Sequence, residues 1–136
     1  MDQFDRPYLI VGLIYGVLGM LLGIYMASSQ DHGQYVTHAH LLLVGFLLSV
    51  LYATMHRLWL PEPKRSFAML QFLAHHLGVV GMVTGLFLLY GGFVPPAAVE
   101  PVLAISSLAV LASLILMLMM VVFSRRTLAT AAQSPA

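Results

Sequence analysis

The sequence predicts an all-α integral membrane protein, a four-helix bundle whose helices each cross a bilayer. The first observation is composition: of 136 residues, 60% are hydrophobic and 8% are charged, which is unlike the composition of soluble domains. The second is that four apolar stretches each have the roughly 20 residues that a helix needs to span about 30 Å of hydrocarbon. The third is that every Lys and Arg flanks these stretches on the same side.

The four predicted helices cover residues 8–26, 35–58, 67–90 and 99–123. The first apolar run is longer than the h-region of a secretory signal, which has about 7–15 residues, so we interpret it as a retained helix. We expect residues 1–126 to form a single transmembrane domain. Segment 127–136, rich in Ala, Thr, Ser and Gln, is expected to be a disordered tail.

The connections between the predicted helices alternate in charge. The first and third contain turn-forming residues such as Gly33 and Pro95 but no Lys or Arg. The second contains Pro61 and Pro63 and is flanked by basic residues, as are both ends of the bundle. The six basic residues are Arg6, Arg57, Lys64, Arg65, Arg125 and Arg126. Cytoplasmic segments carry the excess of such residues, so we expect both termini to be cytoplasmic.

The residues also exclude several classes of protein. The chain has no cysteine, which excludes disulfides, iron-sulfur clusters and covalently attached c-type haem. A net charge of +1 without a soluble basic patch gives no footprint for nucleic acid. No nucleophile and base constellation and no phosphate-binding loop is present, so an autonomous enzyme is not expected.

Small residues form a stripe on the first and on the third predicted helix. The stripes are Gly12, Gly16, Gly19 and Gly23, and then Gly78, Gly81 and Gly85. Spacings of three and four residues place each set on one helix face, where helix backbones approach closely in lipid. We favour packing within one four-helix unit over a dimerisation face.

Histidines provide most of the chemistry available inside the predicted helices. The second and third helices contain His38, His40, His56, His75 and His76, and an ionisable group at membrane depth indicates function. Imidazole is a ligand for haem iron, copper and zinc. The predicted helices offer no acidic or basic side chain at depth that competes with this chemistry.

The spacing of the histidines limits what each can bind. His38 and His40 lie about 200° apart around a regular helix, so they serve different centres rather than one metal ion. His75 and His76 lie about 100° apart, so both can border one pocket. His56 follows His38 by a whole number of turns, which places it on the same face about 27 Å further along the axis.

A purely structural interpretation stays open for these side chains. His56 stands beside Arg57 and Trp59, where we interpret it as an anchor at the inner membrane interface. For His75 and His76, interhelical hydrogen bonds compete with metal binding. For His38 and His40 we prefer metal ligation to a structural role, because two histidines on opposite faces of one helix would need two separate sets of hydrogen-bond partners.

The segment from Thr37 to Gly45, with sequence Thr-His-Ala-His-Leu-Leu-Leu-Val-Gly, resembles the haem-ligating helix of the catalytic subunit of haem-copper oxidases and nitric oxide reductases. In that family the first histidine of the His-x-His pair binds the high-spin haem and the second binds the low-spin haem. The adjacent His75 and His76 are similar to the His-His pair that binds the active-site copper or non-haem iron. The resemblance covers about two helices.

The resemblance implies an architecture and a set of partners. The family subunit has twelve helices in three arcs of four, and this chain has the helices of one arc. A homo-oligomer, dimer or trimer, in a prokaryotic inner membrane is implied, with haem b, a possible additional copper or iron, and an unknown redox partner. By analogy with the family, one haem is held by His40 from two protomers.

From these observations we predict a membrane b-type cytochrome that binds haem through His38, His40, His75 or His76. Its task is electron transfer or the binding of a diatomic gas. Two alternatives stay open: a membrane protein that binds or transports copper, zinc or iron without porphyrin, and a structural accessory subunit whose histidines make interhelical hydrogen bonds.

Overall fold

The computed structural model of the protein describes residues 4–60 and 62–124 and is helical almost throughout. The first span is α1 (Asp5–Ser29), and the second is built from α2 (Tyr35–His40), η1 (Leu41–Leu47) and α3 (Leu48–Trp59). The third is α4 (Arg65–Tyr90) and the fourth is α5 (Pro96–Phe123). All four are long and apolar enough to cross a membrane. The four helices expected from the sequence are therefore present, with ends that differ by up to three residues.

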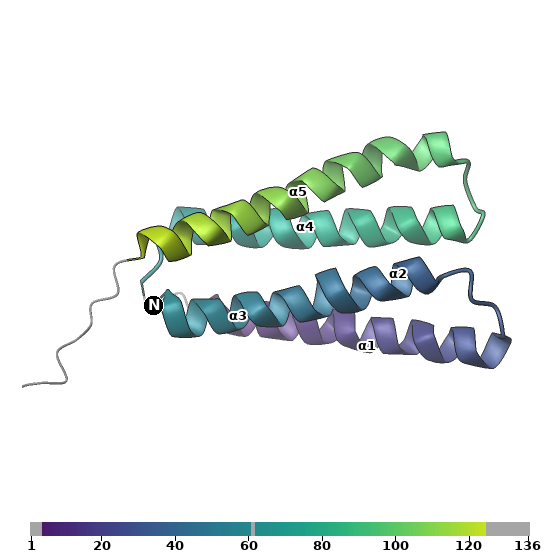
Figure 1. Cartoon of the computed structure of the whole chain (residues 1–136), viewed down its shortest axis with the longest axis horizontal. Coiled ribbons are helices and arrows are strands. Elements are labelled where there is room, and N and C mark those ends of the chain that lie inside the picture. The colour runs from purple at the N-terminus through teal and green to yellow at the C-terminus, as the bar shows by residue number, and fades with distance from the viewer. Residues whose placement is uncertain (1–3, 61, 125–136) are drawn as a thin grey trace, which may run out of the picture.

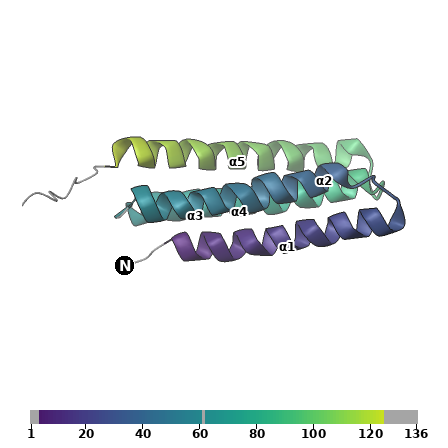
Figure 2. The same ribbon diagram turned by 60° about the horizontal axis from the view of Figure 1, so that its bottom comes forward.

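The helices form two antiparallel pairs that pack side by side (Figure 1). α1 packs along η1 and α3, α4 packs along α5, and the second span contacts α4 from the other side. Turning the molecule leaves α1 and α5 on opposite outer sides, with α3 and α4 between them (Figure 2). The inner faces of the bundle therefore belong mainly to the second and third spans, which carry the histidines.

Local chemistry ends and begins the helices. α1 ends at Gln30, whose backbone is left-handed with φ 57° and whose side-chain amide donates to the Ala27 carbonyl at 2.6 Å. Asp31 then accepts a hydrogen bond from the Gly33 backbone N–H at 2.9 Å, which closes the turn. α5 begins at Pro96, in a position where the missing N–H costs nothing.

The second span contains a π-helical segment, η1, that the sequence analysis did not predict. Its end is marked by the N–H of Leu48, which bonds to the carbonyl of Leu43 five residues earlier. A π-turn widens the helix by one residue and is often found at functional sites. η1 begins directly after His40, so the His-x-His pair lies in the regular α2 and the expected 200° between its members still holds.

Both glycine stripes are used inside the chain, as expected. A Cβ on Gly12 would lie 2.9 Å from Ser49 Cβ, and one on Gly19 would lie 2.6 Å from Leu42 Cδ2, so the stripe of α1 faces the second span. On α4, a Cβ on Gly78 would lie 3.0 Å from the Ser106 carbonyl oxygen of α5. Within each pair, the glycines allow the two helices to pack with their backbones in near contact.

Polar contacts join neighbouring helices at both ends of the bundle. At one end, which we call the basic end because Arg6, Arg57, Lys64 and Arg65 lie there, Arg57 is 3.6 Å from Asp5. At this end too the Ser124 hydroxyl donates to the Trp59 carbonyl at 2.8 Å. At the opposite end the Gln34 side chain donates to the Phe87 carbonyl at 3.0 Å. The beginning of α1 and the end of α5 thus lie at the same end of the bundle. The predicted tail, and Pro61, Arg125 and Arg126, lie outside the described residues.

Large apolar side chains cover the outer faces of α1 and α5. Val17 is 60% exposed and Ile105 is 69% exposed, and many Leu, Ile and Met side chains around them are exposed as well. Continuous apolar surface of this extent is rare on soluble proteins. The arrangement is that of a multi-pass membrane protein whose outer helices face acyl chains.

Replacement of Gly78 by Ala is expected to destabilise the bundle by about 1–3 kcal/mol, because the new methyl group meets the backbone of α5. Gly81→Ala is the matched control, because its methyl group meets only the hydroxyl of Ser106, which can rotate away. Unfolding in mixed micelles followed by circular dichroism measures both. Equal stability of the two variants would contradict the packing described here.

Candidate functional site

His38 is held by a backbone carbonyl of the neighbouring helix. Its Nδ1 lies 2.8 Å from the carbonyl oxygen of Gly19 on α1. A carbonyl only accepts hydrogen bonds, so Nδ1 must carry the proton and donate it. When the ring is neutral, Nε2 therefore holds a free lone pair. Gly23 makes room for this ring, since a Cβ there would lie 2.8 Å from His38 Cε1.

His40 is fixed in the same tautomer by its own helix. Its Nδ1 lies 2.8 Å from the carbonyl oxygen of Val36. Both rings are half-buried. Neither has a buried nitrogen that lacks a hydrogen-bond partner; such nitrogens are found on His56, His75 and His76. A histidine that donates from Nδ1 to a carbonyl and presents Nε2 has the geometry typical of a metal ligand. The ligand role of His38 and His40 stays a prediction, with which this hydrogen bonding is compatible.

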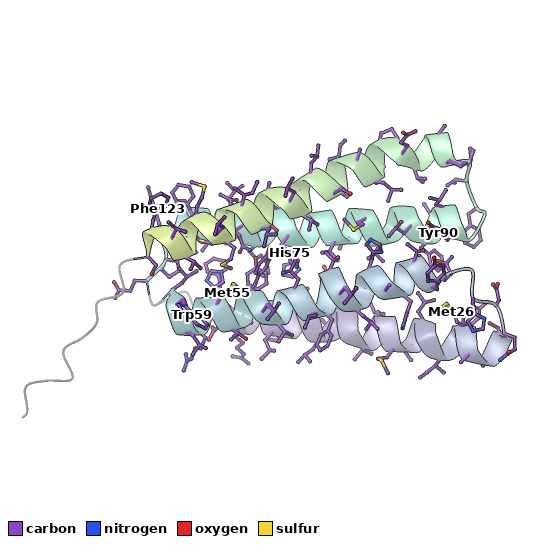
Figure 3. The ribbon with its side chains drawn as sticks, viewed as in Figure 1. Met26, Met55, Trp59, His75, Tyr90 and Phe123 are labelled. Atoms are coloured by element: carbon purple, nitrogen blue, oxygen red, sulfur yellow. The ribbon has the colours of Figure 1, made fainter. Side chains whose placement is uncertain are left out.

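His75 lies elsewhere, near the middle of α4 (Figure 3), and His76 follows it on the same helix. His75 is fully buried, and its Nε2 is 2.9 Å from the Ser49 hydroxyl of α3. His76 Nδ1 is 3.4 Å from the Tyr15 hydroxyl of α1. The two imidazole rings contact each other, with centroids 4.9 Å apart. Each ring therefore joins α4 to a different neighbouring helix.

These two histidines belong to a group of buried polar side chains from three helices. We call it the polar cluster: Tyr8, Tyr52, His56, Gln71, His75 and His76. Tyr8 lies at its centre, with ring centroids 5.5 Å from His56, 5.9 Å from His75 and 5.1 Å from His76. The Tyr8 hydroxyl donates to the side-chain oxygen of Gln71. On the fourth helix, Ser113 of α5 approaches the Tyr52 hydroxyl at 3.5 Å.

The expectation that His56 is an interfacial anchor is wrong. Its side chain is only 5% exposed, and its ring is stacked on Tyr8 and lies 5.7 Å from the ring of Phe4. Arg57 beside it is at the surface and pairs with Asp5. The cause is the start of α1, which covers the end of α3 with two aromatic side chains.

The structure does not bring the four predicted ligands together. Ser49, which bonds His75, follows His40 by nine residues, a rise of about 13 Å along the helix. An apolar layer built around Leu41, Val79 and the ring of Tyr15 occupies the space between. Among the described residues, no group of three or more His, Asp or Glu side chains could hold a metal ion.

Sequence reasoning did not single out Tyr8, Tyr52 or Gln71. A signal exists in the spacing: Tyr52 precedes His56, and Gln71 precedes His75, by four residues, which is one helical turn. Each pair thus places a neutral polar group beside a histidine on one helix face. Tyrosine is common in membrane helices, so only the contact across helices reveals its role.

A cavity of about 530 Å³ lies at the basic end, away from both histidine pairs. Its walls come from the start of α4 and the end of α5 and include Phe67, Met119 and Met120. Lys64 stands at its edge with Nζ 5.4 Å from the centre of the Phe67 ring. This cavity borders none of the imidazole rings.

Neither a protein-family model, nor a curated protein, nor a solved structure matches the chain. The resemblance of the His-x-His segment to the oxidase helix therefore stays a prediction. The functional argument depends on the geometry of His38 and His40 and on the polar cluster.

Tyr8→Phe is expected to lower the free energy of unfolding by about 0.5–2 kcal/mol, because the buried amide of Gln71 loses its hydroxyl partner. Tyr25→Phe is the control, because Tyr25 is 56% exposed. Micellar unfolding of both variants gives the comparison. A Tyr8→Phe variant as stable as the control would show that the hydrogen bond contributes nothing.

Proposed function

We propose that this chain is a membrane b-type cytochrome that binds haem through His38 and His40. The observation that carries the proposal is the pair of Nδ1 hydrogen bonds, to the Gly19 and Val36 carbonyls. Both bonds fix the tautomer that leaves Nε2 free for iron. Helix packing alone does not require two histidines within one turn of a membrane helix that both donate from Nδ1 and keep Nε2 unprotonated.

The number of ligands favours haem over a bare ion. Copper or zinc sites take three or four protein ligands, and the described residues contain no group of three that could supply them. Porphyrin supplies four ligands of its own, so haem iron needs only one or two from the protein. A pair of separate histidines is enough for haem and too few for zinc.

Haem bound through His38 cannot lie between α1 and the second span. The ring lies against Gly23, and the Gly19 face of α1 is filled by Leu42, so the space between α1 and the second span is closed. We therefore place haem on the outside of the bundle, in the half away from the basic end. In this proposal a second copy of the chain covers it, which gives a homo-oligomer, and His40 of each copy is available as an axial ligand.

The protein's own residues set the properties of such a site. The Gly19 and Val36 carbonyls orient the imidazoles and fix their tautomer. Exposed apolar side chains such as Leu43 and Leu47 exclude water from the porphyrin. Bound haem supplies a one-electron redox centre, or a gas-binding site if one axial position stays open. Electron transfer or diatomic gas binding is thus the proposed task, and the membrane is proposed to be a prokaryotic inner membrane with both termini cytoplasmic.

A structural accessory subunit is the second candidate, and a specific observation favours it. His75 bonds to Ser49 and His76 approaches Tyr15, so two of the four predicted ligands already act as interhelical connectors. Such contacts are worth about 0.6–2 kcal/mol each in membranes. We assign His75 and His76 to this structural role and the metal role to the other pair.

His40→Ala is expected to remove a low-spin b-type absorption spectrum from the purified protein, because the axial ligand is lost. His32→Ala is the matched control, since His32 is an exposed loop residue and its loss should leave the spectrum intact. A full spectrum in the His40→Ala variant would refute the assignment. Colourless protein from the unaltered chain would favour the accessory subunit.

Gly23→Ala is expected to shift the Soret band or the electron paramagnetic resonance signal, because the added methyl group displaces the ring of His38. Gly16→Ala provides the comparison, because its methyl group meets the ring of Phe46 instead of a histidine. Spectra that are unchanged in both variants would exclude His38 as a ligand.

A further inference from the structure

Five buried nitrogen atoms in the polar cluster make no hydrogen bond of normal geometry among the described residues, although the Gln71 side chain lies close to His56 and Tyr52. They are both ring nitrogens of His56, Nε2 of Gln71, Nδ1 of His75 and Nε2 of His76. These side chains are between 0% and 9% exposed. An unpaired polar group inside a membrane protein is costly, because no solvent there can replace its hydrogen bonds. Even with Gln71 beside His56, the second nitrogen of His56, Nδ1 of His75 and Nε2 of His76 need partners beyond the side chains of the cluster.

The chemistry of the atoms defines the partner. The hydrogen bond from Tyr8 to the Gln71 oxygen fixes the orientation of the amide, and the NH₂ group at its other end can only donate. Each neutral imidazole offers one acceptor nitrogen and one donor. The partner must therefore accept a hydrogen bond from the amide and donate hydrogen bonds to imidazoles.

We propose that the polar cluster is an internal water-binding site. Water both donates and accepts, and a buried water molecule is held by two to four polar partners. A metal cation cannot bind the NH₂ group of Gln71, and the cluster lacks three metal-binding side chains that converge on one point. An anion would accept from the amide but would face the acceptor nitrogens of the neutral rings.

Apolar side chains pack on both sides of the polar cluster along the bundle axis, so water held there is enclosed and not part of a continuous pore. Phe4, Leu60 and Met117 pack around Tyr8 and Tyr52 toward the basic end. On the other side the apolar layer around Leu41 and Val79 separates the cluster from His38 and His40. In this proposal, water bridges the hydroxyl and imidazole groups that α1, α3 and α4 contribute to the cluster.

X-ray hydroxyl-radical footprinting of the full chain in lipid nanodiscs tests the proposal, because radicals formed from bound water modify the side chains beside it. Met117 packs in the same cluster as Tyr8 and Tyr52 and is 2% exposed, whereas Met82 is 8% exposed and lies six residues beyond His76 on α4. We expect Met117 to be oxidised several-fold faster than Met82. Oxidation of Met117 at or below the rate of Met82 would overturn the proposal.

A variant adds a second readout. Gln71→Leu removes one unpaired donor and should lower the oxidation rate of Met117 toward that of Met82, whereas Gln30→Leu in the outer loop should not. Should Gln71→Leu fail to fold, the comparison of Met117 with Met82 in the unaltered chain decides alone. Stoichiometric copper or zinc that is lost in His75→Ala but kept in His40→Ala would also overturn the proposal, in favour of a cation.

Discussion

An unpaired polar group is expensive in an apolar environment, and this cost explains most of the structure. It requires the backbone to form helices, because no other local structure pairs every N–H and C=O within one segment. It also determines where polar side chains lie: Thr37, Ser49, Gln71 and Ser113 are all buried inside the bundle, while the outer faces of α1 and α5 are apolar. The glycine stripes then bring the helices close enough for side chains such as His38 to reach a backbone carbonyl on the next helix.

The same constraint divides the bundle into two polar regions with different chemistry. In the half away from the basic end, His38 and His40 each use one nitrogen for a carbonyl and keep the other available. Nearer the basic end, the rings of the polar cluster are enclosed by aromatic and apolar side chains and have nitrogens that need further partners. The first region suits a large cofactor approached from outside, and the second suits small molecules held inside. An apolar layer separates the regions, so each can be altered without the other.

Much of the fold was predictable, because hydropathy, turn residues and glycine spacing are properties of the sequence alone. The four helices and the internal use of both stripes follow from them. The π-helical segment η1 was not predictable, since no residue pattern in the sequence marks it; α1 packs against it, with the Tyr15 side chain close to Gly45. The burial of His56 was missed for a similar reason: Phe4 and Tyr8, far away in sequence, cover its ring. The four histidines considered as ligands do lie within helices, as predicted. Spacing along one helix cannot show that His75 and His76 of α4 contact tyrosine side chains of α1.

The central claim is that His38 and His40 hold haem, and it is tested most directly by the absorption spectrum of the detergent-purified chain. The protein is expressed with haem supplied, and spectra are recorded in the oxidised and the dithionite-reduced state. Pyridine haemochrome then gives the amount of haem per chain. We expect a b-type spectrum with one haem per chain, or one for every two chains if protomers share ligands. Protein that folds and contains no haem under these conditions would contradict it.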